Sequence, residues 1–128
     1  MKRDIELIRQ LLLKLEDQKI VPNLTRSLRP ADLQIDGYDI DVIVLHLDML
    51  TNSPYLKNSK IDTGGNLLFM GISWEGHELI DAIREKDVWK ETLENARKNG
   101  STETISFIFE IAKSVIKKQL KEKAGIEF

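Results

Sequence analysis

The sequence predicts a small α+β domain that is mainly helical and carries one short β-hairpin. Apolar residues recur at helical spacing in several segments. A glycine-rich turn, Asp62–Asn66, separates two short extended runs. The chain has 128 residues, of which 41% are apolar and 31% charged, a composition typical of a folded domain. We therefore expect a single domain over residues 1–128.

The N-terminal part is predicted to be a helix followed by a loop. The helix runs from Asp4, its N-cap, to Glu16. Its buried face consists of Ile5, Ile8, Leu12 and Leu15. Residues 17–30 have weak periodicity and contain two prolines, which indicates a loop with at most a short helical turn. Leu33-Gln34-Ile35 alternates and predicts a brief strand.

A second helix and the hairpin are predicted next. The helix runs from its N-cap Asp39 to about Asn52, and Pro54 ends it because proline disfavours helical geometry in the preceding residue. Its buried stripe is Ile40, Ile43, Leu47 and Leu50. Tyr55–Leu56 and Leu67–Ser73 are extended runs on either side of the turn, so we predict a hairpin with a flexible tip.

Two further helices are expected in the C-terminal part. Ser73 is predicted to cap a helix that runs to about Lys98, with a bend or break at Lys86-Asp87 and a stop at Asn99-Gly100. The last helix is predicted over residues 106–123, with its lysines toward the C-terminal end. The expected core is Ile8, Leu12, Ile43, Leu47, Ile83, Trp89, Ile111 and Val115. Both Trp74 and Trp89 are interpreted as core or junction anchors.

Composition excludes several classes of protein. The chain has no Cys, which excludes disulfides, thiol nucleophiles and Cys-ligated metals. Nineteen basic residues against twenty-one acidic ones leave a net charge of −2, without the strongly basic balance of many nucleic-acid-binding proteins. No apolar run approaches the roughly 20 residues that span a bilayer. The charged N-terminus lacks a signal-peptide core, so we expect a cytoplasmic protein with no membrane association.

The predicted order of helix, short strand, helix, two-stranded wing and long helix is typical of a winged-helix domain. In many such domains the second wing strand enters a helix through a hydroxyl cap and an early glycine, as in Ser73-Trp74-Glu75-Gly76-His77. The hydroxyl satisfies free N–H groups, and a residue without Cβ lets the helix approach another element closely.

This block occurs together with Met1-Lys2-Arg3-Asp4, Gly37-Tyr38, His46-x-x-x-Leu50 and Val88-Trp89. In these motifs the chain resembles a family of small, uncharacterised bacterial proteins found in prophages and other mobile elements. The resemblance extends from Met1 to about Lys118. It implies a winged-helix-like fold and a genomic setting, and it implies no activity.

The helix before the wing carries the main functional expectation. In DNA-binding winged helices this element enters the major groove and presents basic or amide side chains. Here it contains three Asp and neither Lys nor Arg. At about 100° per residue, the side opposite the buried stripe consists of Asp41, Leu45, Asp48 and Asn52. Carboxylates repel phosphates, so we predict that this face binds a protein partner. A merely solvated face, or one covered by the last helix, is the alternative.

The second functional hypothesis is a winged-helix transcriptional regulator that binds DNA. Its contacts would come from the basic residues Arg26, Arg29, Lys57, Lys60, Lys117 and Lys121. A solvated helical face explains the lysines of the last helix more simply. Because the apolar face of this helix is wide, we expect helix 106–123 to pack on the domain or to form a homodimer interface.

Nothing in the sequence marks an enzyme, a metal site or a cofactor site. His77-Glu78-x-x-Asp81 lacks the second histidine of a zinc-protease helix, and the turn Asp62–Asn66 lacks the Gly-Lys-Ser/Thr ending of a P-loop. His77 is expected to pack or to form a hydrogen bond at the wing junction, and His46 is expected at the edge of the interior. A hydrolase that uses His77 is the third hypothesis. We therefore expect a non-enzymatic binding module of a phage or mobile element, a regulator or inhibitor of a host or defence factor.

Overall fold

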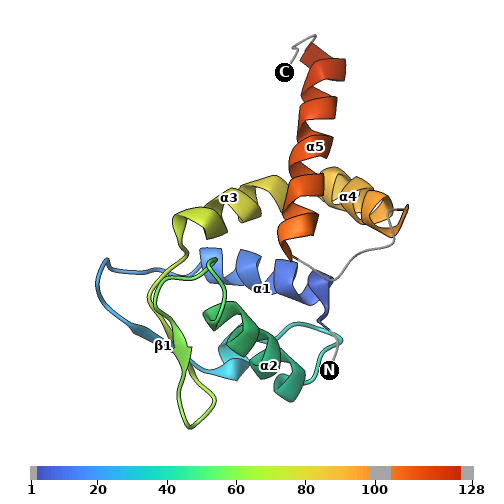
Figure 1. The fold of residues 1–128 in the computed structure, drawn as a ribbon. Helices are drawn as coiled ribbons and strands as arrows, with labels where there is room; N and C mark the ends of the chain where they lie inside the picture. Colours follow the sequence, from blue (N-terminus) through green and yellow to red (C-terminus); the bar gives the residue numbers. More distant parts are fainter. Residues whose placement is uncertain (1–2, 99–104, 125–128) are drawn as a thin grey trace. The chain divides into compact units, whose positions relative to one another are not determined.

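The computed structural model describes residues 3–98 and 105–124 (Figure 1). The chain consists of two compact units, Met1–Glu78 and Leu79–Phe128, and the boundary falls inside one helix. Helices and a small antiparallel sheet confirm the α+β class. The elements are α1 (Ile5–Glu16), β1 (Arg26–Leu28), the 3-10 helix η1 (Pro30–Leu33), α2 (Ile40–Thr51), β2 (Lys60–Ile61), β3 (Leu67–Phe69), α3 (Trp74–Ile83), α4 (Lys86–Lys98) and α5 (Ile105–Ala124).

The sheet of the first unit has three strands in the order β1-β3-β2, and both pairings are antiparallel. Leu28 lies opposite Leu67, and Lys60 lies opposite Leu68. A separate bridge between Leu56 and Ile72 continues the pairing beyond the strands. The element order up to β3 follows the winged-helix expectation, and likeness to winged-helix proteins stays a prediction.

Two predicted strands are wrong in position. Leu33 ends η1 and is not in a strand. The strand of this region is β1, which begins at Arg26, seven residues before the predicted position at Leu33. Pro30 begins η1, and the Asp32 carboxylate accepts from the Arg29 backbone N–H (3.0 Å) while the Asp32 N–H donates to the Arg29 carbonyl (2.9 Å). The chain therefore turns where alternation predicted extension. In the hairpin the first strand is β2, while Leu56 makes a single bridge.

The long third helix is two helices, in agreement with the predicted break. α3 ends at Ile83 and α4 begins at Lys86. The Glu85 side chain caps α4, because its two oxygens accept hydrogen bonds from the backbone N–H groups of Asp87 (3.1 Å) and Val88 (3.0 Å). The predicted stop at Asn99-Gly100 lies outside the described residues.

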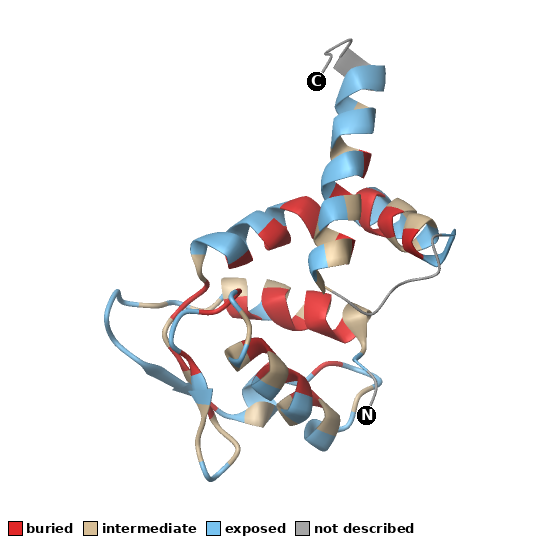
Figure 2. Ribbon diagram, viewed as in Figure 1, coloured by how far each residue is buried: buried red, intermediate tan, exposed pale blue. Residues whose placement is uncertain are grey.

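Burial confirms most of the predicted core (Figure 2). Seven of its eight residues are buried, and Ile111 is half-buried. Two expectations are wrong: Trp74 is 77% exposed and Ile40 is 38% exposed. Each is the first residue of its helix. At this position a shift of the helix by one residue would turn the side chain by about 100°, which is enough to move it between the interior and solvent.

The second unit contains the end of α3 and the packed helices α4 and α5. Its buried side chains include Trp89, Thr92 and Ala96 of α4 and Ala112 and Val115 of α5. The two helices are also joined by Glu91, whose carboxylate accepts from Lys118 (3.3 Å) and Gln119 (3.4 Å). Within the described residues, no helix has the length and apolar content needed to cross a membrane.

Candidate functional site

Helix α2 is held by its buried side. Ile43, His46, Leu47 and Leu50 are buried, and the helix packs on η1 and β2. Asp39 occupies the N-cap position, as predicted, although its side chain makes no capping hydrogen bond. With one side fixed in this way, the opposite side of α2 faces solvent.

All four residues of the predicted partner-binding face are exposed. Leu45 is 48% exposed, and Asp41 and Leu45 line a common groove. Asp48 and Asn52 lie farther along α2 and do not line it. The Asn52 side-chain amide donates to the backbone carbonyl of Asp48 (2.9 Å), so it satisfies the C-terminal end of the helix. Of the four predicted residues, Asp41 and Leu45 therefore line the same groove, and Asp48 and Asn52 lie outside it.

This hollow, the α2–wing groove, has a volume of about 520 Å³. Besides Asp41 and Leu45, its lining residues come from η1, α2 and the hairpin turn: Pro30, Ile40, Val44, Thr63, Gly64 and Gly65. The sequence prediction missed this second set. The spacing of Ile40 and Val44, four residues apart, is the signal that could have shown a second apolar stripe on α2.

The wing tip, Asp62–Asn66, is ordered by one carboxylate. Oδ1 of Asp62 accepts hydrogen bonds from the backbone N–H groups of Gly64 and Asn66, both at 2.9 Å. The bond from the Asn66 backbone is the main cause that lowers the pKa of Asp62, and the Asn66 side chain and the Gly64 backbone add to it. The wing tip therefore brings a carboxylate near the groove without a counter-ion from within the turn.

The surroundings of the groove are acidic. Between residues 30 and 56 the chain has no Lys or Arg and five Asp. The nearby Arg29 binds Asp32, with Nη2 to Oδ1 at 3.0 Å and Nε to Oδ2 at 3.3 Å. This hydrogen bonding raises the pKa of Arg29 and lowers the pKa of Asp32. The guanidinium of Arg29 thus forms an ion pair with Asp32, three residues away in the same segment.

The basic residues of the DNA-binding hypothesis are spread over the chain. Arg26 lies on β1 and Lys60 on β2, whereas Lys117 and Lys121 belong to α5 in the second unit. Arg26 is paired with Phe69 and Lys60 with Leu68, and these are neighbours on β3. Because successive strand residues point to opposite faces, the side chains of Arg26 and Lys60 leave opposite faces of the sheet.

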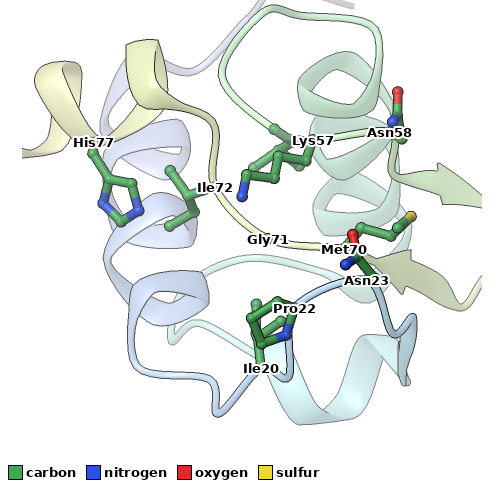
Figure 3. A pocket seen from close by; sticks show the side chains of 10 residues that line it. Ile20, Pro22, Asn23, Lys57, Asn58, Met70, Gly71, Ile72 and His77 are labelled. Atoms are coloured by element: carbon green, nitrogen blue, oxygen red, sulfur yellow. The ribbon is translucent and has the colours of Figure 1, made fainter.

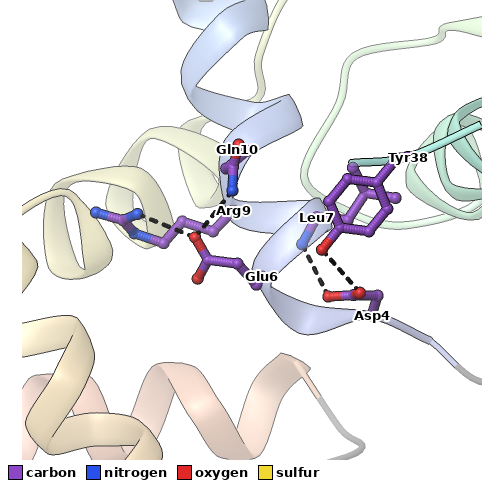
Figure 4. A network of polar contacts seen from close by, with 6 residues as sticks. All are labelled: Asp4, Glu6, Leu7, Arg9, Gln10 and Tyr38. Carbon is purple, nitrogen blue, oxygen red and sulfur yellow. Dashed lines mark hydrogen bonds and ion pairs between the residues drawn. The ribbon is translucent and has the colours of Figure 1, made fainter. Parts of the chain in front are cut away.

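A partly buried polar network joins α1 to α2 and to the segment before α2. Asp4 caps α1, as predicted, because Oδ1 accepts from the Leu7 backbone (3.0 Å), and Oδ2 accepts from the Tyr38 hydroxyl (2.9 Å; Figure 4). The backbone N–H of Asp4 donates to Nε2 of His46 (2.9 Å), and Nδ1 of His46 lies 2.8 Å from the Val42 carbonyl. A carbonyl accepts but cannot donate, so Nδ1 carries the proton. With both ring nitrogens engaged and 1% exposure, His46 is an interior structural residue.

Tyr38 gives this network a measurable pH dependence. Burial, followed by the hydrogen bond and charge of Asp4, raises the pKa of Tyr38 to about 12. An unfolded tyrosine titrates near about pH 10, so the folded chain holds this proton more tightly. The contribution of Tyr38 to stability is therefore complete below about pH 10 and is lost as the pH rises toward about 12. Urea unfolding across this range should show a decline that is smaller in Tyr38→Phe; an equal decline would assign the effect to other groups.

His77 does not pack into the wing junction, contrary to expectation. It is exposed and lines a second pocket near the start of α3. No group of three or more His, Cys, Asp or Glu residues that could hold a metal ion occurs in the described part of the chain.

Comparison with known proteins places the chain in a family. Residues 2–102 match the family described as "Hypothetical protein (DUF2513)". The chain belongs to the DUF2513 family. The DUF2513 match covers α1 to α4 and ends before α5. An uncharacterised protein from Haemophilus influenzae (strain ATCC 51907 / DSM 11121 / KW20 / Rd) is 27% identical over 122 residues, which cover 94% of this chain and 99% of that protein. No solved structure matches.

Proposed function

We propose that this DUF2513 protein is a non-enzymatic binding module that engages a protein partner through the α2–wing groove. The observation that carries the proposal is the combination of exposed apolar side chains, Ile40 and Leu45, with an acidic rim. Burying the apolar side chains would supply affinity, and the carboxylates would reject nucleic acid. In the mobile-element setting that the resemblance implies, such a module would act as a regulator or inhibitor of a host or defence factor.

The chemistry of the groove specifies the kind of partner segment. Its volume of about 520 Å³ is enough for a few anchoring side chains. The rim contributes Asp41. It is flanked by Asp39, the N-cap residue of α2, and by Asp48 of α2. We therefore expect a segment with an apolar anchor for Leu45 and Lys or Arg residues on either side.

Leu45→Lys tests this proposal because it replaces an apolar side chain of the groove lining with a charged one. Capture from extracts of the native host, with wild-type and variant chains as bait, should recover about tenfold less of the partner with Leu45→Lys. Leu24→Lys is the matched control, since Leu24 is 60% exposed and does not line the groove. Equal recovery by both variants would remove the α2–wing groove from consideration.

A DNA-binding regulator is the second candidate, favoured by the element order α1-β1-η1-α2-β2-β3. It predicts binding to random duplex DNA that weakens steeply as salt concentration rises, because bound lysines and arginines release counterions. Fluorescence anisotropy with a labelled duplex separates the two candidates. No binding at low salt favours the protein partner, and steep salt dependence favours the regulator.

A further inference from the structure

A second pocket, of about 550 Å³, lies in the first unit (Figure 3). It forms where the loop after α1 meets the segment before β2 and the segment after β3. Its apolar lining consists of Ile20, Pro22, Leu56, Met70 and Ile72. Its polar lining consists of Asn23, Lys57, Asn58 and His77. We call this cavity the Lys57 pocket. It shares no lining residue with the α2–wing groove.

The polar side of the Lys57 pocket has donors and a positive charge but no carboxylate. Neither Asp nor Glu is among its lining residues. Within the described parts of the chain, the side chains of Lys57 and His77 make no hydrogen bond or ion pair. Figure 3 shows the Lys57 ammonium and the His77 ring on either side of Ile72. An unpaired ammonium, an imidazole and two side-chain amides that line one pocket are a donor set suited to an oxyanion.

The backbone that carries Lys57 is held rigidly. Its N–H donates to the Gly71 carbonyl (2.9 Å), and its carbonyl accepts from the Ser59 hydroxyl (2.6 Å). The buried Ser59 hydroxyl also accepts from the backbone N–H of Met70 (3.1 Å). The backbone position from which the Lys57 side chain extends is therefore fixed by the pairing of two chain segments, so that ligand binding has only the side chain to order.

Unusual backbone conformations also gather at this pocket. Asn23 (φ 68°) and Asn58 (φ 20°) are the non-glycine residues with positive φ in the described chain, and both line the pocket. Gly71, with φ 121°, completes the lining. Such conformations cost free energy and are found preferentially at binding sites.

We propose that the Lys57 pocket binds the oxyanion group, phosphate or carboxylate, of a small molecule. Lys57 would supply the charge, and His77 and the asparagine amides would supply further donors. The apolar wall formed by Ile20, Pro22 and Ile72 would receive the body of the ligand. The volume falls within the range of about 300–1,000 Å³ that small-molecule sites occupy.

Titration of the full chain with inorganic phosphate and with acetate tests this proposal. Binding is followed by the amide chemical shifts of Lys57 and Gly71 in ¹⁵N spectra, with sodium chloride at equal ionic strength as reference. We expect saturable shifts with at least one of the two anions and about tenfold weaker binding in Lys57→Met. His77→Gln is a second variant and should weaken binding by a smaller factor.

Lys60→Met is the matched control, because Lys60 is an exposed lysine of the same segment that does not line the pocket. It should bind within roughly twofold of wild type. Saturation by phosphate alone assigns a phosphorylated ligand, and saturation by acetate alone assigns a carboxylate. No saturation by either anion, or equal binding by Lys57→Met and wild type, would overturn the proposal.

Discussion

Replacing Gly76 with alanine is expected to lower the free energy of unfolding by about 3 kcal/mol or more. A Cβ at this position would overlap the carbonyl oxygen of Tyr55 and would lie 2.5 Å from Cγ2 of Ile72. The first of these contacts is with backbone, so a change of rotamer cannot relieve it. Helix α3 would have to move away from residues 54–55.

That movement would break the hydrogen bonds that seat α3. The Ser73 backbone N–H donates to the Tyr55 carbonyl (3.1 Å), and the Ser73 hydroxyl donates to the Pro54 carbonyl. The same hydroxyl accepts from the N–H of Gly76 (3.0 Å), which confirms Ser73 as the predicted cap. The steric cost and the loss of these bonds therefore act together.

Gly64→Ala is the control for the effect of Gly76→Ala. A Cβ at Gly64 would lie 3.4 Å from Oδ1 of Asp62, an ordinary contact, on a backbone without positive φ. Urea unfolding should therefore show a change within about 0.5 kcal/mol for Gly64→Ala. Similar, small effects of the two substitutions would contradict a close approach at Gly76.

Features determined by neighbouring residues could be predicted from the sequence. The Asp4 and Ser73 caps are confirmed, because each depends on a hydrogen bond within three residues of a helix start. The close approach at Gly76 is also confirmed, because a glycine in the first turn of a helix is a local signal even though its contact, Tyr55, is distant in sequence. The extents of α1, α2 and α5 were predicted within about two residues, since each carries a continuous apolar stripe.

Features that depend on distant partners could not be predicted in this way. β1 has two exposed residues and one buried residue, so no alternation marks it, and it is a strand because β3 supplies its partner. Leu33-Gln34-Ile35 alternates but has no partner strand. Likewise Trp74 and Trp89 both follow apolar stripes, and packing buries Trp89 alone.

The candidate site likewise has one part that follows from local sequence and another part that depends on distant segments. Helical periodicity places Asp41 and Leu45 on the outer side of α2, and the structure agrees. The groove itself requires Pro30 and the wing tip, which lie more than ten residues away in sequence on either side of Leu45. The residues of the Lys57 pocket come from three separate segments and share no motif, so only the fold brings them together.

Replacing His46 with alanine is the second large expected effect, a loss of about 2–4 kcal/mol in the free energy of unfolding. His46 is 1% exposed, so truncation leaves a cavity between α1 and α2. It also removes the acceptor of the Asp4 N–H at the start of α1. The same Asp4 holds Tyr38 through its carboxylate, so the beginning of α1 and the segment before α2 are loosened together.

His46→Gln separates the hydrogen bond from the cavity, because a glutamine amide can accept from Asp4 at a similar reach. We expect it to recover about half of the stability lost in His46→Ala. Amide exchange gives a local readout: the Asp4 N–H should lose protection in His46→Ala and regain part of it in His46→Gln. If His46→Ala left this amide protected while lowering stability, the loss would come from the cavity alone, and the bond between His46 and Asp4 would not be what fixes the start of α1 against α2.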